Sequence, residues 1–130
     1  MGVGQPGPTG PRLLVVDDED AVRGVLVRAL GLWGYTVDAA ASGESALEQL
    51  SRGPATYACV LLDLTMPGMG GVATYRRIKE LDATIPVLFM SGYDSGNTID
   101  GLDLPPPAGF LQKPFDLAVL REVVDATINK

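Results

Sequence analysis

The sequence contains no histidine, a single cysteine and no long uninterrupted apolar run. Without histidine, the chain has no imidazole for metal ligation, for catalysis or for phosphoryl storage. Cys59 cannot form an internal disulfide, which favours a reducing, cytoplasmic setting. No stretch approaches the ~18–20 apolar residues of a membrane span, and no signal peptide is visible. We therefore expect a cytoplasmic domain without membrane contact.

Positive charge is also scarce, since 10 basic residues face 16 acidic ones and the net charge is −6. This balance argues against direct binding of nucleic acid, which needs a basic patch. The 130 residues are 46% hydrophobic, enough for the core of one domain. Residues 1–11 are rich in Gly and Pro and have no periodicity. We interpret them as a flexible tail, a linker or a cloning remnant, followed by one domain over residues 12–130.

Short apolar runs alternate with stretches of helical periodicity along the rest of the chain. The runs predict strands at 12–17, 35–40, 57–64, 85–91 and 108–112. The periodic stretches predict helices at 20–33, 42–50, 71–81 and 116–128. Such alternation is typical of a doubly wound α/β fold, a parallel sheet between two layers of helices. The remaining segment, 94–107, holds two glycines and three consecutive prolines, so a helix there is expected to be short, about 97–102, or irregular.

Four of the predicted strands lead directly into polar residues. These residues are Asp17 and Asp18 at the end of the first strand, Asp63 at the end of the third, Ser91 at the end of the fourth and Lys113 after the fifth. In an open parallel sheet, ligands bind outside the carboxyl ends of the strands. Each residue taken alone is an ordinary strand-end residue, but together they predict one site.

The residue types in this group indicate the chemistry of that site. Carboxylates without a nearby His or Cys suit a hard cation with oxygen ligands, and Mg²⁺ is the expected one. Such a cation would relieve the repulsion within "LLVVDDED" (13–20), with Lys113 as a standing counter-charge. A carboxylate beside Mg²⁺ and a lysine can act as a nucleophile towards phosphorus.

Four motifs together resemble one family. "VVDDE", "LLDLTMPGMGG", "FMSG" and "FLQKPF" occur in the order and spacing of the receiver domain of two-component response regulators, with Ser91 28 residues after Asp63 and Lys113 a further 22 on. The resemblance extends from about Arg12 to Lys130. It implies a flavodoxin-like three-layer fold whose five-stranded parallel sheet has the order 2-1-3-4-5.

The resemblance also implies a role for each matching residue. Asp63 would be the phosphoacceptor, and Lys113 and Ser91 would contact the phosphoryl group. Mg²⁺ would be held by Asp17, Asp18, Asp63 and the backbone carbonyl of Thr65. Ser91 and Phe110 would form the switch, although a plain core role for Phe110 stays open. The family also implies a cis peptide bond between Lys113 and Pro114.

The implied function is signal transduction in a phosphorelay. The domain would accept a phosphoryl group from the phosphohistidine of a histidine kinase or a histidine phosphotransfer domain, and would then change its partner binding without being an enzyme itself. The amino-acid sequences of the motifs are most similar to those in receivers of hybrid sensor histidine kinases, while a stand-alone receiver remains an alternative. The poor helical pattern of 94–107 leaves the usual dimer, and so the oligomeric state, open.

Two other classes of function are weighed against this one. A phosphatase of the haloacid dehalogenase type also uses an Asp nucleophile, Ser/Thr, Lys and Mg²⁺, but its acidic pair comes late in the chain and its second aspartate would be Thr65 here. A receiver-fold binding module that works without phosphorylation would have little reason to keep all five polar residues of the site.

Overall fold

The computed structural model describes residues 10–53, 56–66, 68, 70–92 and 104–129. Within them, strands and helices follow one another nearly as the sequence predicts. The strands are β1 (Arg12–Val16), β2 (Thr36–Ala40), β3 (Cys59–Asp63), β4 (Val87–Ser91) and β5 (Gly109–Gln112). The helices are α1 (Asp20–Leu32), α2 (Gly43–Ser51), α3 (Gly71–Leu81) and α4 (Leu117–Ile128).

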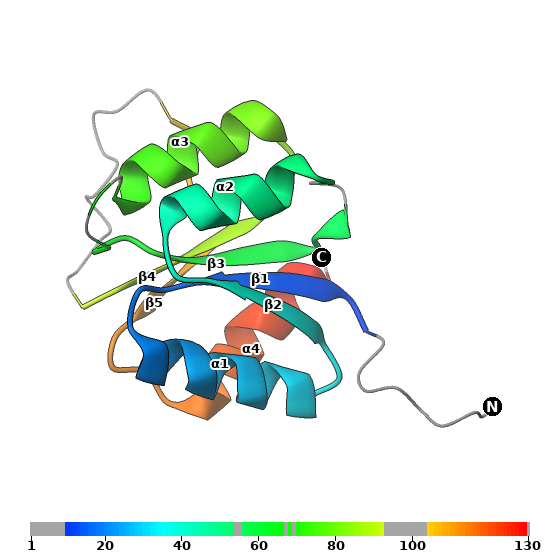
Figure 1. Ribbon diagram of the computed structural model, residues 1–130. Coiled ribbons are helices and arrows are strands. Elements are labelled where there is room, and N and C mark those ends of the chain that lie inside the picture. The colour runs from blue at the N-terminus through cyan, green and yellow to red at the C-terminus, as the bar shows by residue number, and fades with distance from the viewer. Residues whose placement is uncertain (1–9, 54–55, 67, 69, 93–103, 130) are drawn as a thin grey trace.

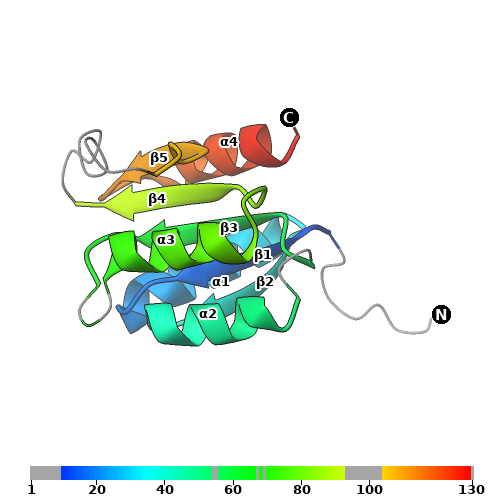
Figure 2. The same ribbon diagram turned by 90° about the horizontal axis from the view of Figure 1, so that it is seen from above.

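All the strands belong to one parallel sheet with the order β2-β1-β3-β4-β5. Figures 1 and 2 show the sheet as the middle layer, with α2 and α3 on one face and α1 and α4 on the other. This arrangement confirms the predicted doubly wound fold and its strand order. Because every strand runs the same way, the carboxyl ends of β1, β3, β4 and β5 meet at one edge.

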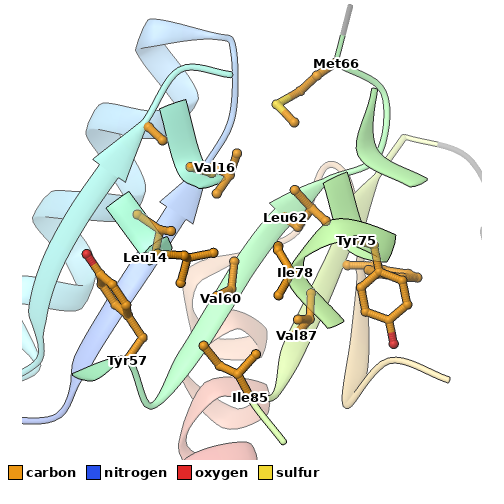
Figure 3. Close-up of a cluster of buried hydrophobic side chains, with 14 residues drawn as sticks. Leu14, Val16, Tyr57, Val60, Leu62, Met66, Tyr75, Ile78, Ile85 and Val87 are labelled. Carbon is orange, nitrogen blue, oxygen red and sulfur yellow. The ribbon is translucent and has the colours of Figure 1, made fainter. Parts of the chain in front are cut away.

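Each face of the sheet carries its own hydrophobic core, because alternate residues of a strand point to opposite faces. On one face, residues of β1, β3 and β4 such as Leu14, Val60 and Val87 pack against Ile78 of α3 (Figure 3). On the other face, the alternate residues of the same strands, such as Leu13, Leu61 and Leu88, pack against α1 and α4. These strand residues are fully buried, as are Leu30 of α1 and Leu120 of α4. Burial on both faces explains why these strands read as continuous apolar runs.

Side chains cap the N-terminal ends of two helices. Ser42 precedes α2, and its hydroxyl accepts a hydrogen bond from the Ser45 N–H at 3.1 Å. Asp116 precedes α4, and its carboxylate accepts one from the Val119 N–H at 2.8 Å. Such caps satisfy backbone donors that have no partner within the helix.

Tyr75 of α3 attaches the segment before β5 to the core. Its ring is fully buried and meets the Phe89 ring edge-on, with 4.7 Å between the ring centroids. Its hydroxyl donates to the Pro105 carbonyl at 2.7 Å. The segment that leads into β5 is therefore held against α3 and does not depend on the sheet alone.

Two predictions fall wholly or mainly on residues that the structure does not describe. The short or irregular helix expected at 97–102 lies outside the described residues, as does nearly all of the tail at 1–11. Among the residues that are described, no helix has the length and apolar character to span a membrane.

Gly71, the first residue of α3, is required by close packing against the end of β3. A Cβ at this position would lie 2.3 Å from the Leu64 Cα and 2.8 Å from the Asp63 carbonyl oxygen. Both are backbone atoms, so a small rotamer change cannot make room. By contrast, Gly31 in α1 has open space around its Cα and no unusual backbone angle.

We therefore expect opposite effects from two Gly→Ala substitutions, measured as free energies of unfolding in urea. Gly71→Ala should destabilise the protein by about 2 kcal/mol or more, in the range of overpacked cores. Gly31→Ala, the matched control, should stabilise it by up to about 1 kcal/mol, because Ala favours the helix. Equal effects of the two substitutions would contradict the packing of α3 on the end of β3.

Candidate functional site

The residues that the sequence singles out lie at the carboxyl edge of the sheet. Asp17 follows β1 directly, Asp63 is the last residue of β3, and Ser91 is the last residue of β4. Asp17 and Asp63 are both fully buried, and Ser91 nearly so. Lys113 follows β5 in the same layer of the molecule. The structure thus brings these four side chains to one edge from four strands.

Lys113 is the electrostatic centre of this group. Its Nζ lies 2.8 Å from Asp17 Oδ2, 3.4 Å from Asp63 Oδ2 and 3.8 Å from Glu19 Oε1. The Lys113 side chain is only 17% exposed. Two buried carboxylates would repel each other strongly in this environment, and the ammonium between them relieves that repulsion.

The pKa of Lys113 records this balance. Burial on its own lowers the pKa of the ammonium, but the hydrogen bond and charge of Asp17, together with those of Asp63, outweigh it and raise the pKa above its ordinary value. Lys113 is therefore fixed in its charged form throughout the physiological range.

Thr65 orients the Asp63 carboxylate from the other side. The Thr65 N–H and hydroxyl donate to Asp63 Oδ1 at 2.9 and 2.8 Å. One carboxylate oxygen is thus held by two donors in the following turn, while the other faces Lys113. Rotation of the carboxylate is restricted at both ends, which fixes its direction at the sheet edge.

Three carboxylates are close enough together to hold a metal ion. Asp17, Asp18 and Asp63 each offer an oxygen, and these oxygens lie within 4.8 Å of one another. Asp18 is exposed, whereas the other two are buried, so the group opens to solvent on one side. The donors are all oxygen, which fits Mg²⁺ and its preference for carboxylates together with retained waters.

Ser91 and Phe110 lie next to this group on β4 and β5. The Ser91 carbonyl accepts a hydrogen bond from the Lys113 N–H at 2.7 Å, and the following Lys113–Pro114 peptide bond is cis, as the resemblance implies. Phe110 is half-buried and packs against the core on the α2/α3 face. Its ring is therefore part of the core, two residues before the end of β5.

Arg23 is a contact of the site that the sequence analysis did not single out. One guanidinium nitrogen, Nη1, donates to the Asp17 backbone carbonyl at 2.7 Å, and Nη2 contacts the Asp20 carboxylate. The available signal was an arginine in the first turn of a helix that opens with a run of acids. Periodicity does not say which way such a side chain turns, so the contact was not predicted.

Comparison with known proteins identifies relatives of this chain. The sequence model of one family, described as the response regulator receiver domain, matches residues 13–125. The sensor kinase CckA of Brucella abortus (strain 2308) is 39% identical over 118 residues, which are 91% of this chain and 12% of the kinase. The response regulator receiver protein CpdR of the same organism is 35% identical over 106 residues, 82% of this chain and 87% of that protein.

Solved structures show the same likeness. The receiver domain of the hybrid histidine kinase CckA aligns with a TM-score of 0.75 and 37% identity, covering 90% of this chain and 98% of that domain. A receiver domain protein from Clostridium thermocellum aligns with a TM-score of 0.84, and its 22% identity shows the fold alone. None of these relatives supports a phosphatase of the haloacid dehalogenase type or a module that works without phosphorylation.

The buried cation makes a testable contribution to stability. Lys113→Met should lower the free energy of unfolding by about 3 kcal/mol, because it leaves buried carboxylates without a counter-charge. The folded pKa of Lys113 lies above its unfolded value, so the difference from wild type should stay constant from pH 7 to about 10 and shrink at higher pH. Urea unfolding across this pH range measures it.

The control for this prediction is the double variant Asp17→Asn/Lys113→Met. It removes one buried charge along with the ammonium, so it should recover part of the loss. A Lys113→Met protein as stable as wild type at pH 7 would contradict the ion pair.

Proposed function

The chain belongs to the response regulator receiver family, and from this membership we propose that Asp63 is the residue that accepts the phosphoryl group. The observation that carries the proposal is the Asp63 carboxylate itself. It is buried at the carboxyl edge, with Lys113 Nζ 3.4 Å from one oxygen and two Thr65 donors on the other. A receiver of two-component signalling needs such an oriented carboxylate beside a fixed cation.

The chemistry follows from the neighbours of Asp63. An Asp63 oxygen forms a bond to phosphorus while the bond between phosphorus and the imidazole nitrogen of the donor breaks. The Lys113 ammonium stabilises negative charge on the phosphoryl oxygens, and the Ser91 hydroxyl at the end of the next strand hydrogen-bonds one of them. The two Thr65 donors fix the direction of the carboxylate, so that little reorientation is needed when the donor arrives.

Asp17, Asp18, Asp63 and the Thr65 backbone carbonyl would hold Mg²⁺ in this site. The oxygen-only donor set of the three carboxylates supports this assignment. When bound, Mg²⁺ neutralises negative charge that Lys113 alone does not balance. The exposure of Asp18 leaves the metal position open to solvent and to the incoming phosphoryl group.

Ser91 and Phe110 would transmit the effect of phosphorylation from the site to the surface of the domain. They lie near the site on adjacent strands, with Ser91 paired in register with Gln112 and Phe89 with Phe110. A hydrogen bond from Ser91 to the phosphoryl group would shift the end of β4. Phe110 packs beside that strand, so its packing on the α2/α3 face would respond.

The phosphoryl donor would be a histidine kinase or a histidine phosphotransfer protein in the cytoplasm, and the domain would have no enzymatic turnover of its own. The 39% identity to part of a sensor kinase favours a receiver of the kind found in hybrid kinases. The chain spans only 12% of that kinase but 87% of a receiver protein, so a stand-alone receiver is the second candidate.

We place the docking site of the donor protein in an apolar groove beside Lys113. It has a volume of about 530 Å³, lies between α1 and the segment that enters α4, and is lined by Ala21, Val22, Val25, Leu26, Lys113, Pro114, Phe115 and Leu117. Val25 and Leu117 are 55% and 44% exposed. An apolar helix seated in this groove would hold its histidine next to Lys113 and within reach of Asp63.

The phosphoacceptor assignment is tested by intact mass after incubation with acetyl phosphate and MgCl₂. We expect the wild type to gain one phosphoryl group, only when Mg²⁺ is present, and Asp63→Asn to gain none. The matched control is Glu44→Gln, an exposed carboxylate on α2, which should behave as wild type. Labelling of Asp63→Asn to the wild-type extent would move the phosphoacceptor to another residue.

The groove is tested with a histidine kinase that phosphorylates the wild type. Val25→Glu places a charge in the groove and should slow transfer from the kinase at least about tenfold, the cost of burying an unpaired charge at an interface. Labelling by acetyl phosphate should be unchanged, since this donor is too small to need the groove. Leu81→Glu, an exposed apolar residue at the end of α3, is the control. Equal slowing by both substitutions would exclude the groove as the docking site.

A further inference from the structure

Arg23 is held in place by contacts that the proposed phosphoryl chemistry does not use. Its Nη1 donates to the Asp17 carbonyl at 2.7 Å, and its Nη2 contacts the Asp20 carboxylate. The Arg23 side chain is only 21% exposed, whereas that of Asp20 is 90% exposed. The guanidinium therefore lies inward, against the turn that joins β1 to α1.

This turn carries the exposed metal-ligand candidate and has no ordinary helix cap. Glu19 is the residue before α1, and its side chain accepts no hydrogen bond from the helix. The turn is fixed instead through Asp17. The Asp17 N–H donates to the Ala40 carbonyl at 3.1 Å, and Asp17 Oδ1 accepts from the Glu19 N–H at 2.9 Å. Arg23 adds the bond that ties the Asp17 carbonyl to α1 itself.

The charge and the position of Arg23 have opposite effects on Mg²⁺ binding. A positive charge on the turn that carries Asp17 and Asp18 repels an incoming cation, so by charge alone Arg23 weakens Mg²⁺ binding. By position, however, Arg23 holds the turn so that the Asp17 and Asp18 side chains leave it in fixed directions. The planar guanidinium suits this second task, because two of its nitrogens donate in fixed directions at once.

We propose that Arg23 is a positioning residue that holds the β1–α1 turn, and with it the carboxylates of Asp17 and Asp18, in the arrangement that Mg²⁺ requires. This inference rests on the proposed function, which places the metal among Asp17, Asp18 and Asp63. It predicts that the geometric effect of Arg23 outweighs its charge repulsion.

The test compares Mg²⁺ affinity among four proteins by titration with MgCl₂, followed through backbone amide resonances in solution. The proteins are the wild type, Arg23→Met, Arg23→Lys and Arg28→Met. Arg23→Met removes charge and donors but keeps the apolar stem. Arg23→Lys keeps the charge and loses the two-nitrogen fork. Arg28→Met removes an exposed arginine of the same helix and is the matched control.

We expect the dissociation constant for Mg²⁺ to rise about tenfold in Arg23→Met, the lower end of what loss of a ligand-orienting partner costs a metal site. Arg23→Lys should also bind Mg²⁺ more weakly than wild type, although its charge is intact. Arg28→Met should leave the constant unchanged. At saturating MgCl₂, the extent of Asp63 labelling by acetyl phosphate should return to the wild-type level in both Arg23 variants.

Tighter or unchanged Mg²⁺ binding in Arg23→Met would overturn the inference, since charge would then be the only effect. Weaker stability towards urea with an unchanged dissociation constant would also overturn it, because the role would then be purely structural. If Arg23→Met does not fold, the Arg23→Lys comparison decides. These outcomes leave the proposed function intact, whereas absence of Mg²⁺ binding by the wild type would overturn the metal assignment and this inference together.

Discussion

The rest of the site depends on one electrostatic constraint, the burial of two carboxylates at the edge of a sheet. Asp17 and Asp63 are fully enclosed, and Lys113 is the cation between them. A buried like-charge pair without a counter-charge costs several kcal/mol, so Lys113 contributes to the stability of the fold as well as to the proposed chemistry. The Lys113 N–H also bonds to Ser91, which joins the end of β5 to the end of β4.

The same constraint leaves the site with a defined charge deficit. The carboxylates of Asp17, Asp18 and Asp63 outnumber the single ammonium of Lys113 among them. A divalent cation offsets this excess of negative charge more fully than a monovalent cation does. In the proposed reaction, a phosphoryl group on Asp63 would add negative charge beside the Lys113 ammonium, which would stabilise it together with any bound Mg²⁺. The resting balance of charge and the proposed chemistry therefore have the same cause.

The sequence predicts the fold well because the strands are buried on both faces. β3 and β4 are enclosed along their whole length, so each stands out as an apolar run. Strand boundaries are less accurate, since Tyr57 is buried in the core although it precedes β3. Burial alone does not distinguish a core residue in a loop from one in a strand.

The position of the site can also be predicted from the sequence, because it follows from the parallel sheet. Contacts that depend on side-chain direction cannot be predicted in this way. Parallel strands bring their carboxyl ends to one edge, so Asp17, Asp63 and Lys113 are placed together by topology. The contacts of Arg23 and Tyr75 were not predictable in this way. The Tyr75 hydroxyl meets a carbonyl 30 residues away, and neither contact has a periodic signal. They depend on side-chain direction, which the sequence pattern does not encode.

The alternation of β5 separates the two proposed surfaces of the domain. Phe110 points to the α2/α3 face, and Leu111, the next residue, points to the α1/α4 face. The groove beside Lys113 is lined by residues of α1 and of the segment that enters α4, and these two helices cover the same face of the sheet (Figure 1). A phosphoryl donor seated there would leave Phe110 uncovered, and a change in Phe110 packing would reach a surface that the donor does not occupy. The two-residue period of one strand thus puts Phe110 and the proposed donor groove on opposite faces of the sheet.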